Sequence, residues 1–199
     1  MNQRRREGTV QHAQRIKKRF CDALLELSET TPLEKITVSA LVEQAGTARQ
    51  TFYNHFYDIN DLVSYLPINF LNDHDVEIHK AQSLEPAYSY AREHAAFFRQ
   101  LPHHSGQNNF RDSFVQWFEN AYKQHYITDD MPEEEREYRT ISIGIYACGI
   151  TGVFLEWCKA DFSWSLETLL RAQADYVPPF VYEDPAFPVS DSPNARASR

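Results

Sequence analysis

The sequence has few of the residues that build disulfide scaffolds or phosphate-binding loops. Its 199 residues include three cysteines, Cys21, Cys148 and Cys158, with no CxxC or zinc-type spacing. An odd number of thiols in helix-like segments indicates reduced cysteines, as in a cytoplasmic protein. Glycine is also scarce, with six residues and no Gly-rich phosphate loop. A disulfide-rich secreted domain and a P-loop enzyme are therefore excluded.

Long apolar runs and catalytic motifs are missing as well. The longest apolar run, Ile141 to Leu155, is shorter than the roughly 20 residues of a membrane span, and residues 1–10 are basic and polar, unlike a signal peptide. No nucleophile motif and no pair of carboxylates in an apolar context is present. The eight histidines show no firm metal-ligand spacing. We therefore expect no membrane partner, no enzyme activity, no cofactor and no metal.

What the chain does have is an uneven charge. Residues 1–20 hold seven Lys or Arg against Glu7 alone, whereas the whole chain has a net charge of −8. An acidic chain with a basic N-terminus is typical of a protein that touches a polyanion with one end. Residues 1–9 are predicted to form a flexible basic arm.

Residues 10–66 predict a compact unit of short helices. Apolar positions at helical spacing indicate a first helix from Val10 to Glu29, a second over Val38–Ala45, a third over Ala48–His55, and a fourth that begins after Asp58. Gly46 separates the second and third helices. This spacing is that of a helix-turn-helix, whose later helix is presented outward.

The third helix carries side chains suited to DNA. Arg49 has the fork that pairs with guanine, and Gln50 can pair with adenine. The methyl groups of Thr47 and Ala48 suit thymine, and Tyr53 and His55 are placed for phosphate contacts. The complete predicted interface with double-stranded DNA is Thr37, Thr47, Ala48, Arg49, Gln50, Thr51, Tyr53, Asn54 and His55.

The same stretch resembles the tetracycline-repressor (TetR) family of bacterial transcription regulators. The resemblance rests on Ile36-Thr37-Val38, Leu41, Ala45-Gly46, Thr51-Phe52-Tyr53, His55-Phe56 and Leu62. The run Arg49–Tyr53 is most similar to the subgroup of dihydroxyacetone-kinase operon regulators. The resemblance implies a homodimeric regulator, a repressor as we expect, that binds a near-palindromic operator. It also implies a helical domain that binds an effector and dimerises.

Two positions depart from the family's pattern. The family usually has Ser, which caps the recognition helix, where this chain has Ala48. It usually has a phosphate-contacting Lys where this chain has Ile59. Thr47 and the basic N-terminus are the candidates to replace these two functions.

The remainder predicts an all-α body over residues 67–176, since helical periodicity recurs and no alternating strand is found. Aromatic residues on its helices suit an apolar pocket for a small apolar or aromatic effector, although packing of the rings against one another is the better explanation for any one of them. The pocket residues would be His94, Phe98, Phe114, Trp117, Phe118, Tyr122 and Tyr146.

The last two helices of the body have apolar surface to spare, as a twofold helix-bundle interface requires. The small residues Gly144, Cys148 and Gly152 are spaced by four and allow close approach of another backbone. With Trp164 and Leu169 they form the predicted dimer interface. Residues 177–199 contain five of the ten prolines and predict a disordered tail. The competing hypothesis is a helical interaction or scaffold module with a vestigial helix-turn-helix.

Overall fold

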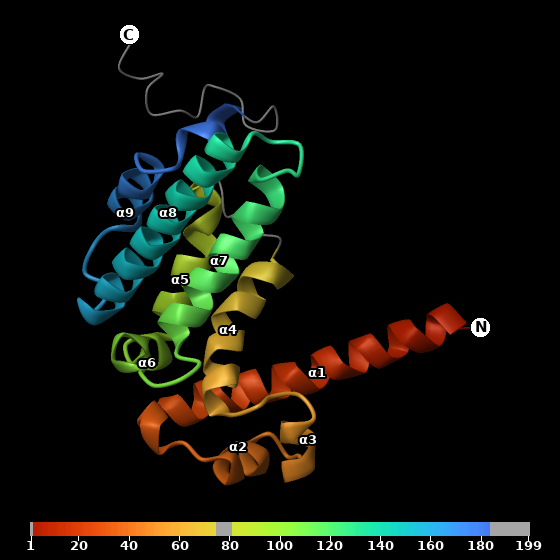
Figure 1. Ribbon diagram of the computed structural model, residues 1–199. Coiled ribbons are helices and arrows are strands. Elements are labelled where there is room, and N and C mark those ends of the chain that lie inside the picture. The colour runs from red at the N-terminus through yellow and green to blue at the C-terminus, as the bar shows by residue number, and fades with distance from the viewer. Residues whose placement is uncertain (1, 75–80, 184–199) are drawn as a thin grey trace.

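The computed structural model describes residues 2–74 and 81–183, with side chains for residues 10–74 and 83–182. All regular structure in these residues is helical, which confirms the predicted all-α class. Figure 1 shows a long first helix crossing one end of the molecule, two short helices below it, and a helical body above.

The N-terminal unit comprises α1 (Asn2–Ser28), the 3₁₀ turn η1 (Leu33–Lys35), α2 (Val38–Gln44), α3 (Arg49–Tyr53) and the start of α4 (Ile59–Asp73). Side-chain caps begin two of these helices. The Thr37 hydroxyl accepts from the Ala40 N–H at 3.2 Å, and the Asp58 carboxylate accepts from the Asp61 N–H at 2.8 Å. In the sequence Asp58 and Asp61 resemble a capping pair, and the Asp58 cap confirms that the fourth helix begins after Asp58.

Aromatic rings hold this unit together. Phe20 of α1 packs edge-on against Phe52 of α3 at 5.4 Å and against Phe56 at 6.0 Å between ring centroids. Phe56 in turn contacts Tyr65 of α4 at 5.3 Å. All but Tyr65 are almost completely buried, so α3 is anchored by one face and leaves the other free.

The body contains η2 (Ala81–Leu84), α5 (Glu85–Glu93), α6 (Ala95–Phe98), η3 (Leu101–His103), α7 (Phe110–Tyr126), α8 (Glu133–Lys159) and α9 (Leu166–Ala174). The apolar stripe from Ala87 to Leu101 suggests one helix in the sequence, but the chain turns at His94 and divides it into α5 and α6. Helix α7 packs along α8, and Trp157, Phe118 and Phe110 are among the buried residues of the shared core.

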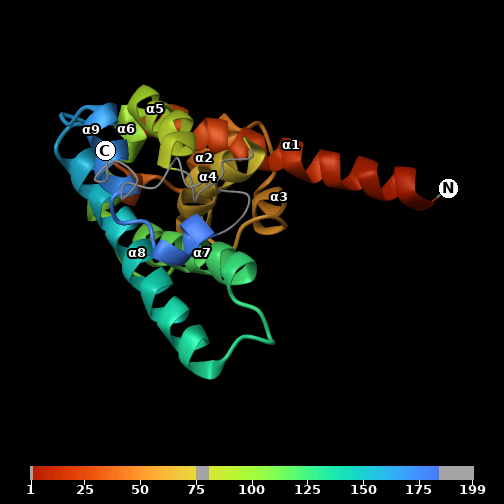
Figure 2. The ribbon, with the colours of Figure 1, turned by 90° about the horizontal axis from the view of Figure 1, so that it is seen from above.

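Helix α4 connects the two parts. The helix continues through Pro67, which is a buried residue. Figures 1 and 2 show that α4 runs from the N-terminal unit into the body, while the N-terminal half of α1 projects away from the rest.

Both chain ends differ from the expectation. The predicted flexible arm is helical in its backbone from Asn2, because no proline interrupts the run and Arg, Gln and Glu favour helix. The predicted disordered tail is ordered at its start, where η4 (Pro179–Glu183) buries Phe180 and Val181 against the core. Residues 184–199 lie outside the described part of the chain.

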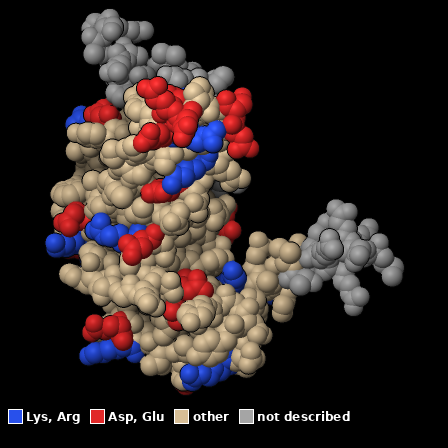
Figure 3. Space-filling view, in the orientation of Figure 1, with Lys and Arg blue, Asp and Glu red and all other residues tan. Residues whose placement is uncertain are grey.

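Helix α8 has the length and hydropathy of a membrane span, and 44% of its apolar window is buried within the protein. One such helix is also what the core of a water-soluble protein contains. On the face shown in Figure 3, acidic side chains gather at the end of the body far from the N-terminal unit, where α8 begins with Glu133, Glu134 and Glu135.

Candidate nucleic-acid interface

Helix α3 presents one continuous polar face to solvent. Arg49, Gln50, Tyr53 and Asn54 are exposed, while Phe52 on the opposite side is completely buried. Positions four apart on a helix are neighbours, so Arg49 lies beside Tyr53 and Gln50 lies beside Asn54. These two adjacent rows form the exposed patch. The patch has hydrogen-bond donors and acceptors suited to the edges of bases in a major groove.

The exposed side chains are held by weak, exchangeable contacts. The Arg49 guanidinium donates to the Ser39 hydroxyl at 3.3 Å and to the Tyr53 hydroxyl at 3.4 Å. The Gln50 amide donates to the Asn54 side-chain oxygen at 3.1 Å. Such long, solvent-exposed bonds preorganise the side chains and are easily exchanged for contacts to bases. Ser39 was not among the predicted residues, and its position on the outer face of α2 is the signal that would have found it.

The other predicted residues lie around this patch. Thr37 and Ala48 are exposed, and Thr47, Thr51 and His55 are partly buried. Burial first, and then the Lys17 ammonium and His12, lower the pKa of His55. Its imidazole is therefore neutral at pH 7 and offers a hydrogen bond rather than a charge to a phosphate.

Helix α3 lacks a side-chain cap. Ala48 occupies the N-cap position, and its methyl group accepts no hydrogen bond. The Thr47 hydroxyl is buried without a hydrogen-bond partner in this structure, so Thr47 does not replace the missing cap. One of the orphan N–H groups of α3 is left to solvent.

We expect Ala48→Ser to stabilise the protein by about 0.5–1 kcal/mol, because a serine hydroxyl at the N-cap satisfies one of these N–H groups. Urea unfolding of wild type and variant measures the gain. Ala13→Ser, in the middle of α1, is the matched control and should be neutral or slightly destabilising. Equal effects at the two positions would show that α3 gains nothing from a cap.

The turn before α3 is braced from α1. Gly46 has φ = +58°, a conformation that favours glycine, and the Arg19 guanidinium donates to the carbonyl oxygens of Ala45 at 2.5 Å and Gly46 at 3.0 Å. A Cβ atom on Gly46 would lie 3.1 Å from that guanidinium. Arg19, which the charge pattern placed with the DNA-attracting residues of α1, thus positions the helix-turn-helix turn.

Other basic residues of α1 are also engaged locally. The Lys17 ammonium lies 4.4 Å from the centre of the Tyr65 ring, and Lys18 pairs with Asp22 at 2.7 Å. An Arg15 guanidinium nitrogen lies 3.1 Å from Nδ1 of His12. The contacts of Lys18 and Arg15 are exposed, and those of Lys17 are partly buried. Exposed pairs of this kind are weak and leave the charges of Lys18 and Arg15 available to a polyanion.

Arg19→Met should weaken operator binding more than Lys18→Met, although each variant loses one positive charge. Arg19 holds the turn that sets the angle of α3, whereas Lys18 pairs only with a neighbouring carboxylate in the described structure. We expect a difference of about threefold or more, corresponding to roughly 0.7 kcal/mol for a partly exposed charged hydrogen bond. Anisotropy titrations with the same labelled duplex measure it. Equal losses of affinity in the two variants would show that Arg19 contributes only its positive charge.

The predicted pocket residues are dispersed. A cavity of about 40 Å³ lies between α4, α5, α7 and α8, and of the seven predicted residues Phe98, Phe114 and Phe118 line it. His94 faces a separate groove between α1, α4 and α5, and Tyr146 lines the outer groove between α8 and α9. Trp117 and Tyr122 pack beside the cavity on α7. The prediction missed several apolar lining residues: Pro67, Phe70, Leu71, Leu84, Ala87, Tyr88, Tyr90, Phe110, Ile150 and Phe154.

The predicted interface residues are divided as well. Cys148 and Trp164 are exposed, Gly144 and Gly152 are partly exposed, and Leu169 is buried within its own chain. The sequence did not single out the large apolar residues beside them. Ile141, Ile145 and Val153 of α8 and Tyr176 after α9 are exposed, with Ile145 at 70% and Tyr176 at 79%.

The chain is similar in structure to two solved proteins. "Dihydroxyacetone kinase operon activator DhaS" has a TM-score of 0.54 and 22% identity, with 81% of this chain and 93% of that chain covered. The "Crystal structure of NalD, the secondary repressor of MexAB-OprM multidrug efflux pump in Pseudomonas aeruginosa" has a TM-score of 0.47 and 15% identity, with 80% and 93% covered. No protein-family model and no curated protein matches the chain. The likeness to DhaS shows that the chain has a TetR-type fold.

Proposed function

We propose that this chain, which has the TetR-type fold, is a DNA-binding transcription regulator that reads DNA through α3. The observation that carries the proposal is the exposed patch of Arg49, Gln50, Tyr53 and Asn54 on a helix whose other face is anchored by Phe52. A short helix with one buried face and one polar face fits the major groove.

The proposal includes a homodimer with two such helices. Exposed Ile141, Ile145 and Val153 form a stripe along α8, and a groove of about 290 Å³ lies between this stripe and α9. A second copy of the chain would cover this apolar surface by twofold symmetry. Two recognition helices then read a near-palindromic site.

The chain is proposed to act as a repressor whose effector-free form binds the operator. The cavity lined by Phe98, Phe114 and Phe118 has no charged side chain among its lining residues, which suits a small apolar or aromatic effector. Its volume of about 40 Å³ is far below the roughly 300–1,000 Å³ of pockets for drug-sized ligands. An effector of that size therefore requires the rings to move, and it acts by favouring one arrangement of the two helix-turn-helix units.

The direct test is a titration of the full-length protein with the DNA upstream of its own gene, at 50–200 mM salt. We expect tight binding whose logarithm falls linearly with the logarithm of salt concentration. Binding that ignores sequence, or no binding, would favour the scaffold hypothesis. Addition of small aromatic compounds to the bound complex then tests the effector part, which fails if none changes operator affinity.

A further inference from the structure

The loop between η3 and α7 is hydrogen-bonded to the first two turns of α4. The Asn60 amide donates to the Gln107 carbonyl oxygen at 2.9 Å, and the Ser64 hydroxyl donates to the Asn108 carbonyl oxygen at 3.3 Å. Gly106 and Asn108 have φ of 99° and 56°, so the loop has a specific, tightly turned backbone. This contact joins the body to the helix that leads out of the helix-turn-helix unit.

His104 lies at the centre of this contact. The Phe110 backbone N–H donates to Nδ1 of His104 at 3.2 Å, which requires that this nitrogen carry no proton. The neutral ring therefore has its proton on Nε2, and Nε2 donates to the side-chain oxygen of Asn60 at 2.9 Å. One imidazole thus holds the start of α7 and the start of α4 at the same time.

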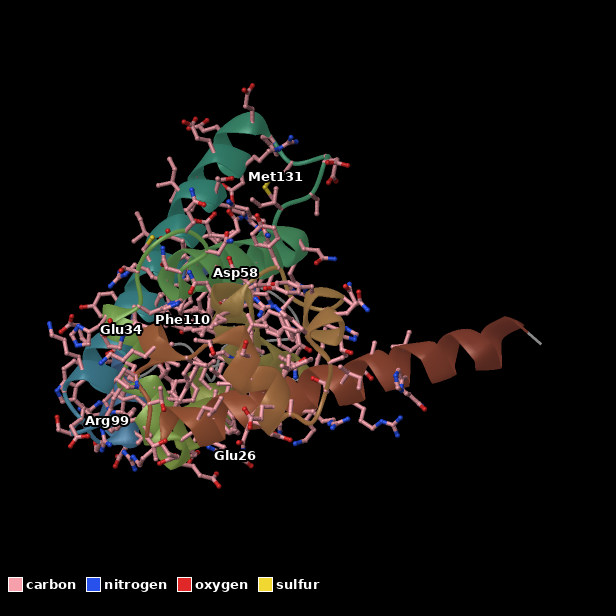
Figure 4. All side chains as sticks on the ribbon, turned by 90° about the horizontal axis from the view of Figure 1, so that it is seen from below. Glu26, Glu34, Asp58, Arg99, Phe110 and Met131 are labelled. Atoms are coloured by element: carbon pink, nitrogen blue, oxygen red, sulfur yellow. The ribbon has the colours of Figure 1, made fainter. Side chains whose placement is uncertain are left out.

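One partner of His104 also lines the aromatic cavity. The Phe110 ring is completely buried and lines the cavity, while its N–H holds His104. Helix α4 also lines the cavity further along, through Pro67, Phe70 and Leu71. Figure 4 labels Phe110 at the start of α7 and Asp58 at the start of α4. Helix α4 is therefore held near its start by the 104–109 loop and in its second half by the cavity wall.

We propose that neutral His104 is a positioning residue that couples the aromatic cavity to the orientation of the helix-turn-helix unit. A displacement of Phe110 changes the place of its N–H, and His104 passes that change to Asn60 in the first turn of α4. The inference rests on the proposed function, in which the effector-free arrangement binds DNA. Loss of either hydrogen bond of His104 then loosens α4 and weakens operator binding.

Protonation breaks the arrangement, because an imidazolium cannot accept from the Phe110 N–H. Burial lowers the pKa of His104 from its ordinary value of 6.5, and the Asp58 carboxylate opposes part of that shift. Other ionisable groups on the elements around this junction include Glu34 on η1, Asp61 in the first turn of α4, Arg99 after α6, His103 on η3 and Asp112 in the first turn of α7. The bond from the Phe110 N–H to Nδ1 is intact above the folded pKa of His104, which lies below 6.5, and it is lost as pH falls through that pKa. Nε2 keeps its proton and its bond to Asn60 in the imidazolium.

Two variants test the relay by keeping one bond each. In His104→Asn the amide oxygen can still accept from Phe110, and in His104→Gln the amide N–H can still reach Asn60; neither side chain titrates. His103→Gln is the matched control, since this neighbouring histidine is exposed. Operator binding is measured by anisotropy from pH 5 to pH 8 at constant ionic strength, for the full chain and the upstream duplex.

The informative quantity is the ratio of wild-type to variant affinity, because it cancels the titration of His55. We expect a ratio of about 5 or more at pH 7.5 for both His104 variants, the lower range of allosteric coupling, falling toward one below the folded pKa. For His103→Gln the ratio should stay near one. Amide hydrogen exchange supplies a reading without DNA: residues 62–64 should exchange faster in both His104 variants and not in the control.

The outcomes separate the two proposals. Wild-type binding with a ratio near one at every pH, and unchanged exchange in α4, overturns the role of His104 and leaves the proposed function standing. Accelerated exchange in α4 with no operator binding by any protein supports the positioning role and removes the DNA-binding function.

Discussion

Replacement of Arg49 by alanine is expected to lower operator affinity by about 5- to 150-fold, which corresponds to roughly 1–3 kcal/mol for a bidentate contact to a base. Arg49 is exposed on α3 and makes hydrogen bonds of 3.3 and 3.4 Å to Ser39 and Tyr53, and its guanidinium lies 5.8 Å from the centre of the Tyr53 ring. The variant loses the guanidinium fork and little folding free energy, because the Arg49 side chain is not part of the core. Anisotropy with the upstream duplex measures the loss.

A base contact and a phosphate contact are distinguished by the DNA sequence. The Arg49→Ala variant should bind with nearly equal affinity to duplexes that differ in the base at one operator position. At the other positions the variant should still distinguish between bases as wild type does. Arg171→Ala is the control, since Arg171 is exposed on α9 and its replacement by alanine also removes one positive charge. If both variants lose affinity equally, or if Arg49→Ala discriminates bases as wild type does, Arg49 does not read a base.

The helix-turn-helix could be predicted from sequence because each of its parts is local. Thr37 caps α2, Gly46 supplies the turn, and Asp58 caps α4, each within a few residues of its partner. Such contacts depend on spacing along the chain, and the structure reproduces them. The missing cap at Ala48 was predicted from the family resemblance, since the family usually has Ser at this position.

The bracing of that unit could not be predicted, since it depends on residues distant in sequence. Arg19 reaches the turn at Gly46 across 27 positions, and His104 reaches Asn60 across 44. From sequence alone, Arg19 is most simply interpreted as part of a basic helix face and His104 as a residue of a solvated loop. Only the packing of α1 and of the 104–109 loop shows which carbonyl and amide groups they meet.

The body shows a related limit. Helical periodicity predicted an all-α body over residues 67–176, but it did not show which aromatic rings surround a cavity and which pack against one another. Phe114 and Trp117 belong to the same stripe of α7, yet Phe114 lines the cavity and Trp117 does not. Likewise, the predicted interface on α8 was based on the small residues Gly144, Cys148 and Gly152. The large exposed apolar residues of this helix are instead Ile141, Ile145 and Val153.

Helix α8 has nearly uniform apolar character around its middle, and such a helix requires cover on more than one side. Helix α7 covers one side, with the completely buried Ile143 and Ala147 turned inward. Ile141 and Ile145, at 56% and 70% exposure, remain on the uncovered side. A cysteine on the same helix, Cys148, is exposed there, whereas Cys21 and Cys158 are buried.

Ile145→Glu is therefore expected to raise the dissociation constant of the dimer by about 100-fold or more. A carboxylate forced into an apolar interface without a partner costs several kcal/mol, and about 2.8 kcal/mol already gives a factor of 100. Sedimentation velocity at micromolar concentration should show a dimer for wild type and a folded monomer for the variant. Operator binding should fall with it, since a monomer presents one recognition helix to a two-part site.

Gln116→Glu on α7 is the matched control, because Gln116 is exposed and the change adds the same charge to a neighbouring helix. It should leave the dimer intact. Labelling of Cys148 by a maleimide gives a second measurement: the thiol should be protected in wild type and in Gln116→Glu, and reactive in Ile145→Glu. A wild-type monomer at these concentrations, or an Ile145→Glu dimer as tight as wild type, would place the twofold interface elsewhere than on the exposed stripe of α8.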